Sequence, residues 1–200
     1  MRLKIIFMGL LLALAAPAFP QAKPAAELRS PQLLIGAGFT DFSSDWATTR
    51  DISSAEWIDW KPNLGPSALK GLGIEAEYRE YQYAQIGSQS LTQSTVGGGP
   101  IYTVQHWPDI HPYAKFLINN GQMIHTDNST IPTTYPTTSW LTWAPGGGIE
   151  YRAWGNLWVR EDYEYQYWRT NLKPGDNHFL NPNGFTICIS YDLGRLHRGH

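Results

Sequence analysis

An alternation of polar and apolar side chains is the feature that most constrains the fold. In residues 159–168, VREDYEYQYW, Arg160, Asp162, Glu164 and Gln166 alternate with valine and tyrosines, and Glu161 departs from the pattern. A period of two places successive side chains on opposite faces of a β-strand. Segments of roughly ten residues with this alternation recur and end in turn-forming residues, which is typical of an antiparallel barrel. The pattern therefore predicts an all-β protein.

We expect eight strands, joined alternately by two kinds of connection. The predicted strands are 33–42, 53–61, 71–83, 89–104, 111–123, 139–152, 157–168 and 183–193. The connections at one end are fairly short, at 62–70, 105–110 and 153–156. Those at the other end are mostly long and rich in Asp, Asn, Thr and Pro, at 43–52, 84–88, 124–138 and 169–182. This asymmetry predicts an eight-stranded antiparallel up-and-down transmembrane β-barrel, and the even strand count places both chain termini at the short-turn end.

Two closures of such a barrel fit the alternation. In a soluble, lipocalin-like barrel the apolar face lines the interior, whereas in a membrane barrel it meets lipid and the polar face lines the interior. The polar faces mix both charge signs with glycines, which suits a narrow interior packed with ion pairs. Only 16% of the chain is charged, whereas a soluble surface is usually dense in Lys and Glu. Both observations favour the membrane closure.

The membrane closure assigns side chains to the inside and to the lipid. The predicted interior ion network consists of Glu75, Glu77, Arg79, Lys115, Glu150, Arg160, Asp162, Glu164 and Gln166. Aromatic residues near strand ends are expected in interfacial girdles on the outside. The residues so assigned are Trp57, Trp60, Trp140, Trp143, Trp158, Tyr167 and Trp168. Strict alternation also places Glu161 on the lipid face, where an acid costs about 2 kcal/mol or less.

The N-terminus predicts export. Arg2 and Lys4 precede a short apolar run, 5–16, and small residues follow. This is the pattern of a signal peptide over 1–22, with cleavage after Ala18 or Ala22. We expect a flexible lead-in over 23–32, the barrel over 33–193 and a C-terminal tail over 194–200.

Two neighbouring strands resemble a known family. Residues 146–168, GGGIEYRAWGNLWVREDYEYQYW, are similar to the sixth and seventh strands of small outer-membrane barrels of the OmpA-like type. In those barrels a Gly-Gly-x-Glu-Tyr strand, a tight turn and an Arg-x-Glu-Tyr-Gln-Trp strand follow one another. GLGIEAEYR (71–79) and PYAKFLI (112–118) look similar to other strands of these barrels. The likeness spans most of 31–193 as a pattern and is specific only in 146–168 and 183–193.

The resemblance carries expectations about location and biogenesis. It implies a barrel-only member in the outer membrane, with Glu150, Arg160, Glu164 and Gln166 in the polar interior. The family's last strand carries a signal for the outer-membrane assembly machinery, and the matching positions here are Cys188, Tyr191 and Leu193. Cysteine stands where the family has glycine, and leucine stands where it has a terminal aromatic residue.

Several functional classes lack support in the sequence. A net charge of -2 argues against a nucleic-acid partner. The single cysteine excludes an intrachain disulfide and a cysteine-based structural zinc site. Neither a Gly-x-Ser-x-Gly elbow nor a His-Glu-x-x-His pair occurs, and GGGP at 97–100 reads as a strand kink. We therefore predict no enzyme and no catalytic, cofactor or metal site.

The expected function is structural or interaction-based. An eight-stranded barrel leaves an interior that side chains just fill, so an ion-paired interior predicts a closed envelope component with external loops. Its expected partners are outer-membrane lipid and the assembly machinery, and the polar loop 124–138 is where an external ligand would bind. The alternatives are a soluble or periplasmic lipocalin-like binding barrel, a small pore, and a lipid A-modifying enzyme that uses His125 or His178 beside Ser129 or Ser139.

Overall fold

The computed structural model describes residues 31–45, 50–63, 69–82, 89–127, 138–169 and 179–194. The predicted signal peptide, the lead-in up to residue 30 and the tail from residue 195 lie outside the described residues. Within the described ranges, no helix is long and apolar enough to cross a membrane.

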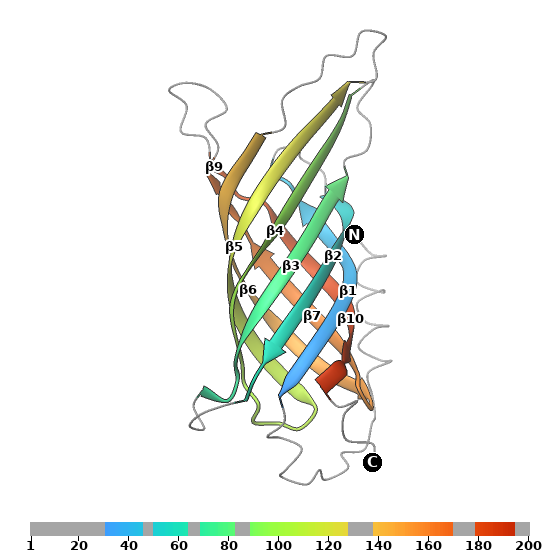
Figure 1. The fold of residues 1–200 in the computed structure, drawn as a ribbon. Helices are drawn as coiled ribbons and strands as arrows, with labels where there is room; N and C mark the ends of the chain where they lie inside the picture. The colour runs from blue at the N-terminus through green and yellow to red at the C-terminus, as the bar shows by residue number, and fades with distance from the viewer. Residues whose placement is uncertain are drawn as a thin grey trace.

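The strands close into one antiparallel barrel (Figure 1). Their bounds are Gln32–Ser43 (β1), Arg50–Lys61 (β2), Leu72–Gln82 (β3), Gln89–Thr103 (β4), Ile110–Asp127 (β5), Thr138–Trp154 (β6), Leu157–Tyr165 (β7), Tyr167–Arg169 (β8), Phe179–Leu180 (β9) and Asn183–Asp192 (β10). Consecutive strands pair from β1 to β7, and pairings of β10 with both β7 and β1 complete the ring. Since β8 prolongs β7 and β9 precedes β10, the ten segments make eight barrel strands, and the predicted fold class is confirmed.

A local break explains why the seventh and eighth barrel strands are each divided. Gln166 lies outside the strand ladder, and its backbone N–H donates to the carbonyl of Pro182 at 2.8 Å. Beyond it, Trp168 pairs with Leu180, so part of the predicted loop 169–182 belongs to the sheet. At the opposite end, Gly155 has a φ of 55° in the two-residue turn between β6 and β7, a conformation that glycine adopts without steric cost.

The two ends of the barrel differ less in loop length than the sequence predicted. We call the end with connections 62–71, 104–109 and 155–156 the short-turn end, and the other the long-loop end. At the long-loop end β5 reaches Asp127 and β6 begins at Thr138, so only 128–137 connect them, outside the described residues. Pairing of Gln89 with Asp127 prolongs the wall of β4 and β5 upward in Figure 1. Backbone pairing continues there because it requires no apolar face.

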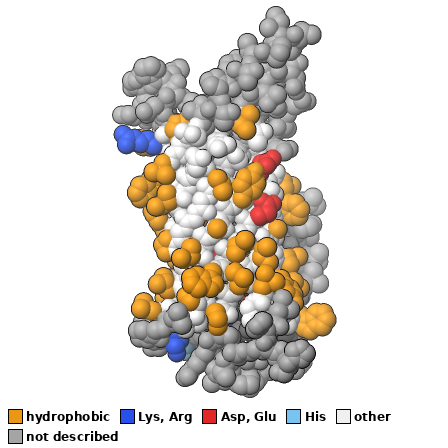
Figure 2. All heavy atoms as spheres, viewed as in Figure 1, with side chains coloured by type: hydrophobic (Ala, Val, Ile, Leu, Met, Phe, Trp, Pro, Cys, Tyr) orange, Lys and Arg blue, Asp and Glu red, His pale blue; other side chains and the backbone are white. Residues whose placement is uncertain are grey.

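The barrel wall carries its apolar side chains on the outside. Figure 2 shows hydrophobic side chains spread over the described outer face, with few charged ones among them. Along β1, Ile35 and Phe39 are exposed, whereas Thr40 is fully buried. A lipocalin-like binding barrel needs the opposite arrangement, with its apolar face inside. The structure therefore contradicts the soluble closure.

The predicted aromatic girdle is wrong for four of its members. Trp60, Trp143 and Tyr167 face outward, each about half exposed. The other members lie inside the barrel: Trp57, Trp158 and Trp168 are buried, and Trp140 packs on Trp168. The reason is local, because each inward tryptophan shares its strand face with polar side chains two residues away. Strict alternation would have predicted the inward orientation of these four tryptophans, whereas their proximity to strand ends predicted an outward one.

Candidate functional site: the charged interior

Ten buried charged side chains from five barrel strands form the interior ion network. They are Asp59 and Lys61 on β2, Glu75, Glu77 and Arg79 on β3, Lys115 on β5, Glu150 on β6, and Arg160, Asp162 and Glu164 on β7. Arg152 on β6 and Asp192 on β10 are buried as well. Each alternates with an outward residue, so the pleat alone turns these side chains inward. In the ion network, six carboxylates share four cations, and each cation contacts more than one acid.

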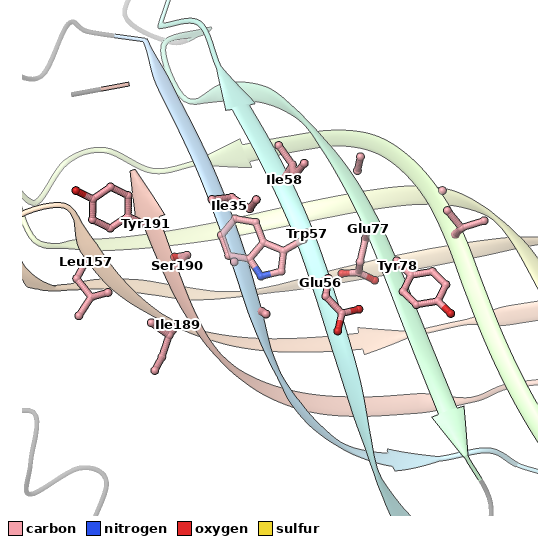
Figure 3. A pocket seen from close by; sticks show the side chains of 15 residues that line it. Ile35, Glu56, Trp57, Ile58, Glu77, Tyr78, Leu157, Ile189, Ser190 and Tyr191 are labelled. Atoms are coloured by element: carbon pink, nitrogen blue, oxygen red, sulfur yellow. The ribbon is translucent and has the colours of Figure 1, made fainter. Parts of the chain in front are cut away.

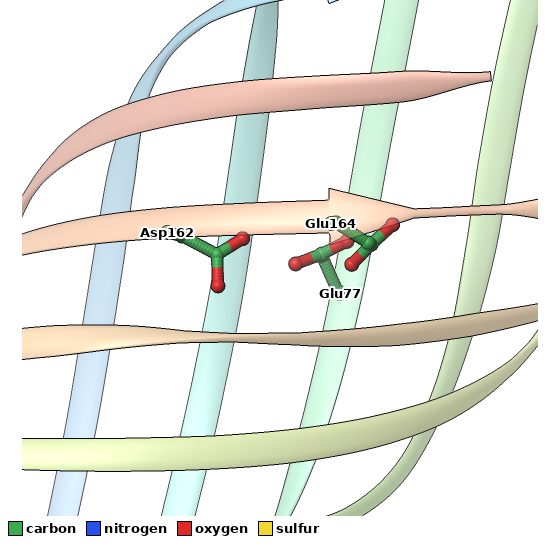
Figure 4. A group of neighbouring side chains, drawn as sticks. All are labelled: Glu77, Asp162 and Glu164. Carbon is green, nitrogen blue, oxygen red and sulfur yellow. The ribbon is translucent and has the colours of Figure 1, made fainter.

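Lys115 lies at the centre of the set. Its Nζ is 2.9 Å from Glu75 Oε1, 2.6 Å from Glu77 Oε2, 3.2 Å from Asp162 Oδ2 and 3.0 Å from Glu164 Oε2. The last three acids bring carboxylate oxygens within 4.8 Å of one another, a spacing that could hold a metal ion. Figure 4 shows their carboxylates converging from β3 and β7. The lysine ammonium is the cation that these carboxylates share.

A glycine makes room for this lysine. A Cβ at Gly146 of β6 would lie 2.9 Å from Lys115 Cε and 2.9 Å from the backbone oxygen of Tyr163. Real Cβ atoms do not approach other atoms so closely without displacement. Gly146 is therefore part of the site, because a side chain at this position would collide with Lys115.

Two arginines extend the network across the lumen. Arg160 Nη2 lies 2.7 Å from Glu75 Oε2, and its Nε donates to the hydroxyl of Tyr113 at 2.7 Å. The Arg160 guanidinium also lies over the ring of Trp57, 4.2 Å from its centroid. Arg79 contacts Glu77 and Asp162, and its Nη1 donates to Thr186 Oγ1 at 2.7 Å. These contacts tie β3, β5, β7 and β10 together from inside.

The network continues toward the short-turn end, where Arg160 Nη1 lies 3.3 Å from Asp59 Oδ2. Lys61 Nζ donates to both oxygens of Glu150, at 2.9 and 2.8 Å, and lies 3.4 Å from Asp59 Oδ2. Beside it, the Arg152 guanidinium stacks over Trp158, with Arg152 Cζ 5.0 Å from the ring centroid. A charge buried in a low-dielectric interior is tolerated only when it is paired and hydrogen-bonded. Lys61 and Glu150 meet this condition, whereas Arg152 Nε and Nη2 are buried without a hydrogen-bond partner among the described residues.

Apolar and aromatic side chains pack inside the barrel toward the long-loop end. Met123, Trp168 and Leu180 form a buried cluster against which Trp140 packs, and Phe42 stacks on Tyr81 with ring centroids 3.4 Å apart. The Trp168 indole N–H donates to Gln166 Oε1 at 2.8 Å, and Gln166 Nε2 donates to Glu164 Oε1 at 2.7 Å. This chain connects the apolar layer, here called the cap, to the charges below it.

The structure places all nine predicted interior residues inside the barrel, and each contacts at least one other member of the set. The eight charged members share ion pairs, and Gln166 contacts Glu164 by a hydrogen bond. The prediction missed Asp59 and Lys61, although both alternate with Trp60 and could have been found from the pattern. It also missed the Tyr113 hydroxyl, although Tyr113 lies two residues before Lys115 and shares its strand face. Glu161 is exposed on the outer face, where alternation put it.

The enzyme alternative named residues near the long-loop end. Ser129, His178 and the side chain of His125 lie outside the described residues, and Ser139 is exposed. Most of the predicted ligand-binding loop, 128–137, also lies outside them.

Known proteins share this fold without close similarity in sequence. The chain matched no protein-family profile and none of the curated proteins. Among solved structures, neisserial surface protein A aligns with a TM-score of 0.61 at 12% identity, over 82% of this chain and 97% of that protein. A major outer-membrane protein of Thermus thermophilus aligns with a TM-score of 0.58 at 13% identity, over 82% and 100%. Ail, the attachment invasion locus protein of Yersinia pestis, gives 0.51 at 13%, over 82% and 98%.

These alignments define the class of fold. The chain has the closed eight-stranded architecture of small outer-membrane β-barrels, and the resemblance to OmpA-like barrels is confirmed at the level of the fold. Its polar interior and apolar exterior are the polarity that this architecture has in a membrane.

Proposed function

We propose that this protein is an integral outer-membrane component whose barrel is a sealed anchor that displays loops at its long-loop end. The observation that carries the proposal is a polarity opposite to that of a water-soluble protein. The charged side chains of the network are buried inside, while Ile, Leu, Phe, Trp and Tyr side chains are exposed outside. Such a molecule would be insoluble in water without a lipid or detergent belt, because it exposes a continuous apolar band. In this proposal, outer-membrane lipid and the assembly machinery are its partners.

The side chains that pack inside the lumen support an anchor rather than a pore. The ion pairs bridge opposite walls, from Lys61 on β2 to Glu150 on β6 and from Arg160 on β7 to Glu75 on β3. The cap formed by Met123, Trp168 and Leu180 covers the network toward the long-loop end. Interaction with the outside would then fall to the loops, including residues 128–137. No catalytic role is part of the proposal.

Gel migration of the outer-membrane fraction tests the proposal. Every backbone group of a closed sheet is paired within the barrel, so lipid-embedded barrels keep their structure in cold SDS. We expect the protein in the outer-membrane fraction, with a band that shifts when the sample is boiled. Recovery in the soluble periplasmic fraction with no shift would contradict the proposal.

A further inference from the structure

The outer wall carries an apolar hollow that the anchor role does not use. A groove of about 600 Å³ crosses the outer face from the start of β7 over β10, β1, β2 and β3 to β4 (Figure 3). We call it the wall groove. Small side chains at Ala37 and Ala76 lie among larger outward ones, including Ile35, Ile58 and Ile189. The hollow arises because these alanines do not fill the row that their neighbours occupy.

One carboxylate borders this groove. Glu56 of β2 is exposed on the outer face, and within the described part of the chain it makes neither a hydrogen bond nor an ion pair. Its cross-strand neighbour Tyr78 donates its hydroxyl to Glu80 Oε2 at 2.7 Å instead. An unpaired acid on a lipid-facing wall is unfavourable. A positively charged group beside Glu56 would remove that cost.

The position of Glu56 along the barrel indicates the shape of the occupant. Outward side chains change from apolar to acidic between Phe39 and Asp41 on β1, and between Tyr78 and Glu80 on β3. These changes mark the edge of the apolar band toward the long-loop end. Glu56 pairs with Tyr78 and with Ala37, so it lies one outward position inside that edge on the β3 side and two on the β1 side. The groove continues from there to Leu157 and Tyr191, near the short-turn end. An occupant therefore needs a polar head at the edge and an apolar body along the wall.

We propose that the wall groove binds an amphiphile with a positively charged head group, whose cation lies beside Glu56 and whose chain lies over Ala37 and Ala76. The volume lies within the range of roughly 300–1,000 Å³ that is usual for small-molecule sites, which favours a single amphiphile over a protein segment. The inference rests on the proposed membrane location.

Spin-labelled amphiphiles in phosphatidylcholine vesicles test this site. Three probes share one octadecyl chain with the same nitroxide and carry a trimethylammonium, a hydroxyl or a sulfate head. Electron paramagnetic resonance measures the fraction of each probe that the folded barrel immobilises. We expect the cationic probe to associate roughly two- to fivefold more strongly than the hydroxyl probe, as one partly screened charge pair provides. The preference should disappear in Glu56→Gln.

Two matched variants separate this site from general lipid contact. Glu161→Gln removes an outward acid of β7 that does not border the groove, so it should keep the preference. Ala76→Leu should reduce immobilisation of the cationic probe by filling the hollow, whereas Ala114→Leu on the outer face of β5 should not. Equal association of all three probes with the unchanged protein, or loss of the preference in Glu161→Gln, would overturn the site. Absence of any immobilised probe would instead refute the membrane location.

Discussion

Lys115 is the residue on which most of the interior charge converges. One ammonium contacts four carboxylates that reach it from two other strands, β3 and β7. Removing one partner of a buried ionic group leaves the other charges without compensation, which costs more than the pair itself contributes. The stability of the barrel therefore depends on individual ionic groups inside the lumen.

Replacement of Lys115 by methionine should destabilise the barrel strongly. The side-chain volume is similar, so the main effect is loss of the shared cation, with an expected cost of about 3–5 kcal/mol. Urea unfolding in vesicles, followed by tryptophan fluorescence, measures it. The surface variant Glu161→Gln serves as the control, and an equal change in the two variants would argue against a stabilising network.

A Gly146→Ala variant should be destabilised for a related steric reason. The new methyl group would meet Lys115 Cε and the Tyr163 carbonyl, each at 2.9 Å, and overpacking of this kind costs about 1–3 kcal/mol. Because the methyl and the lysine compete for the same space, the effects of Gly146→Ala and Lys115→Met should be less than additive. A double-mutant cycle of unfolding free energies checks this, and strict additivity would show that the two groups do not compete.

At the scale of the strand, β7 shows how a period of two separates opposite environments. Arg160 contacts acids inside the barrel, while the next residue, Glu161, is exposed on the outer face. The side chains of these two consecutive residues thus lie in different environments: Arg160 lies in the ion network, and Glu161 lies on the lipid-facing side of the wall. Apolar substitutions at these two positions should therefore change stability in opposite directions.

The pair Arg160→Leu and Glu161→Leu tests that statement on one strand. Loss of the Arg160 guanidinium should lower the unfolding free energy by about 3–5 kcal/mol, because it leaves buried acids unpaired. Loss of the Glu161 carboxylate should raise it by about 1 kcal/mol, since an acid on the lipid face is unfavourable. Unfolding in vesicles measures both variants. Destabilisation by both would place Glu161 in a polar environment and contradict the lipid-facing wall.

For the molecule as a whole, a filled lumen predicts no steady conductance. The cross-wall pairs of Lys61 and Arg160 and the cap at Trp168 occupy the path between the two ends. We expect protein reconstituted in planar bilayers to show no discrete current steps in molar salt. A porin measured in the same bilayers verifies that channels are detectable. Reproducible steps from the purified protein would favour the small pore instead.

The sequence determined much of this protein by itself, because strand periodicity is a local property. Alternation predicted the all-β class, the number of barrel strands and the inward face of β7, and applied strictly it would also have turned Trp57 inward. Only the tertiary structure decided the extension of β5 to Asp127 and the partners inside the lumen. Lys61 and Glu150 meet across a sequence separation of 89 residues. Their pairing depends on how the sheet closes and how its strands are staggered, and the alternation of any single strand is the same whichever partner lies across the barrel.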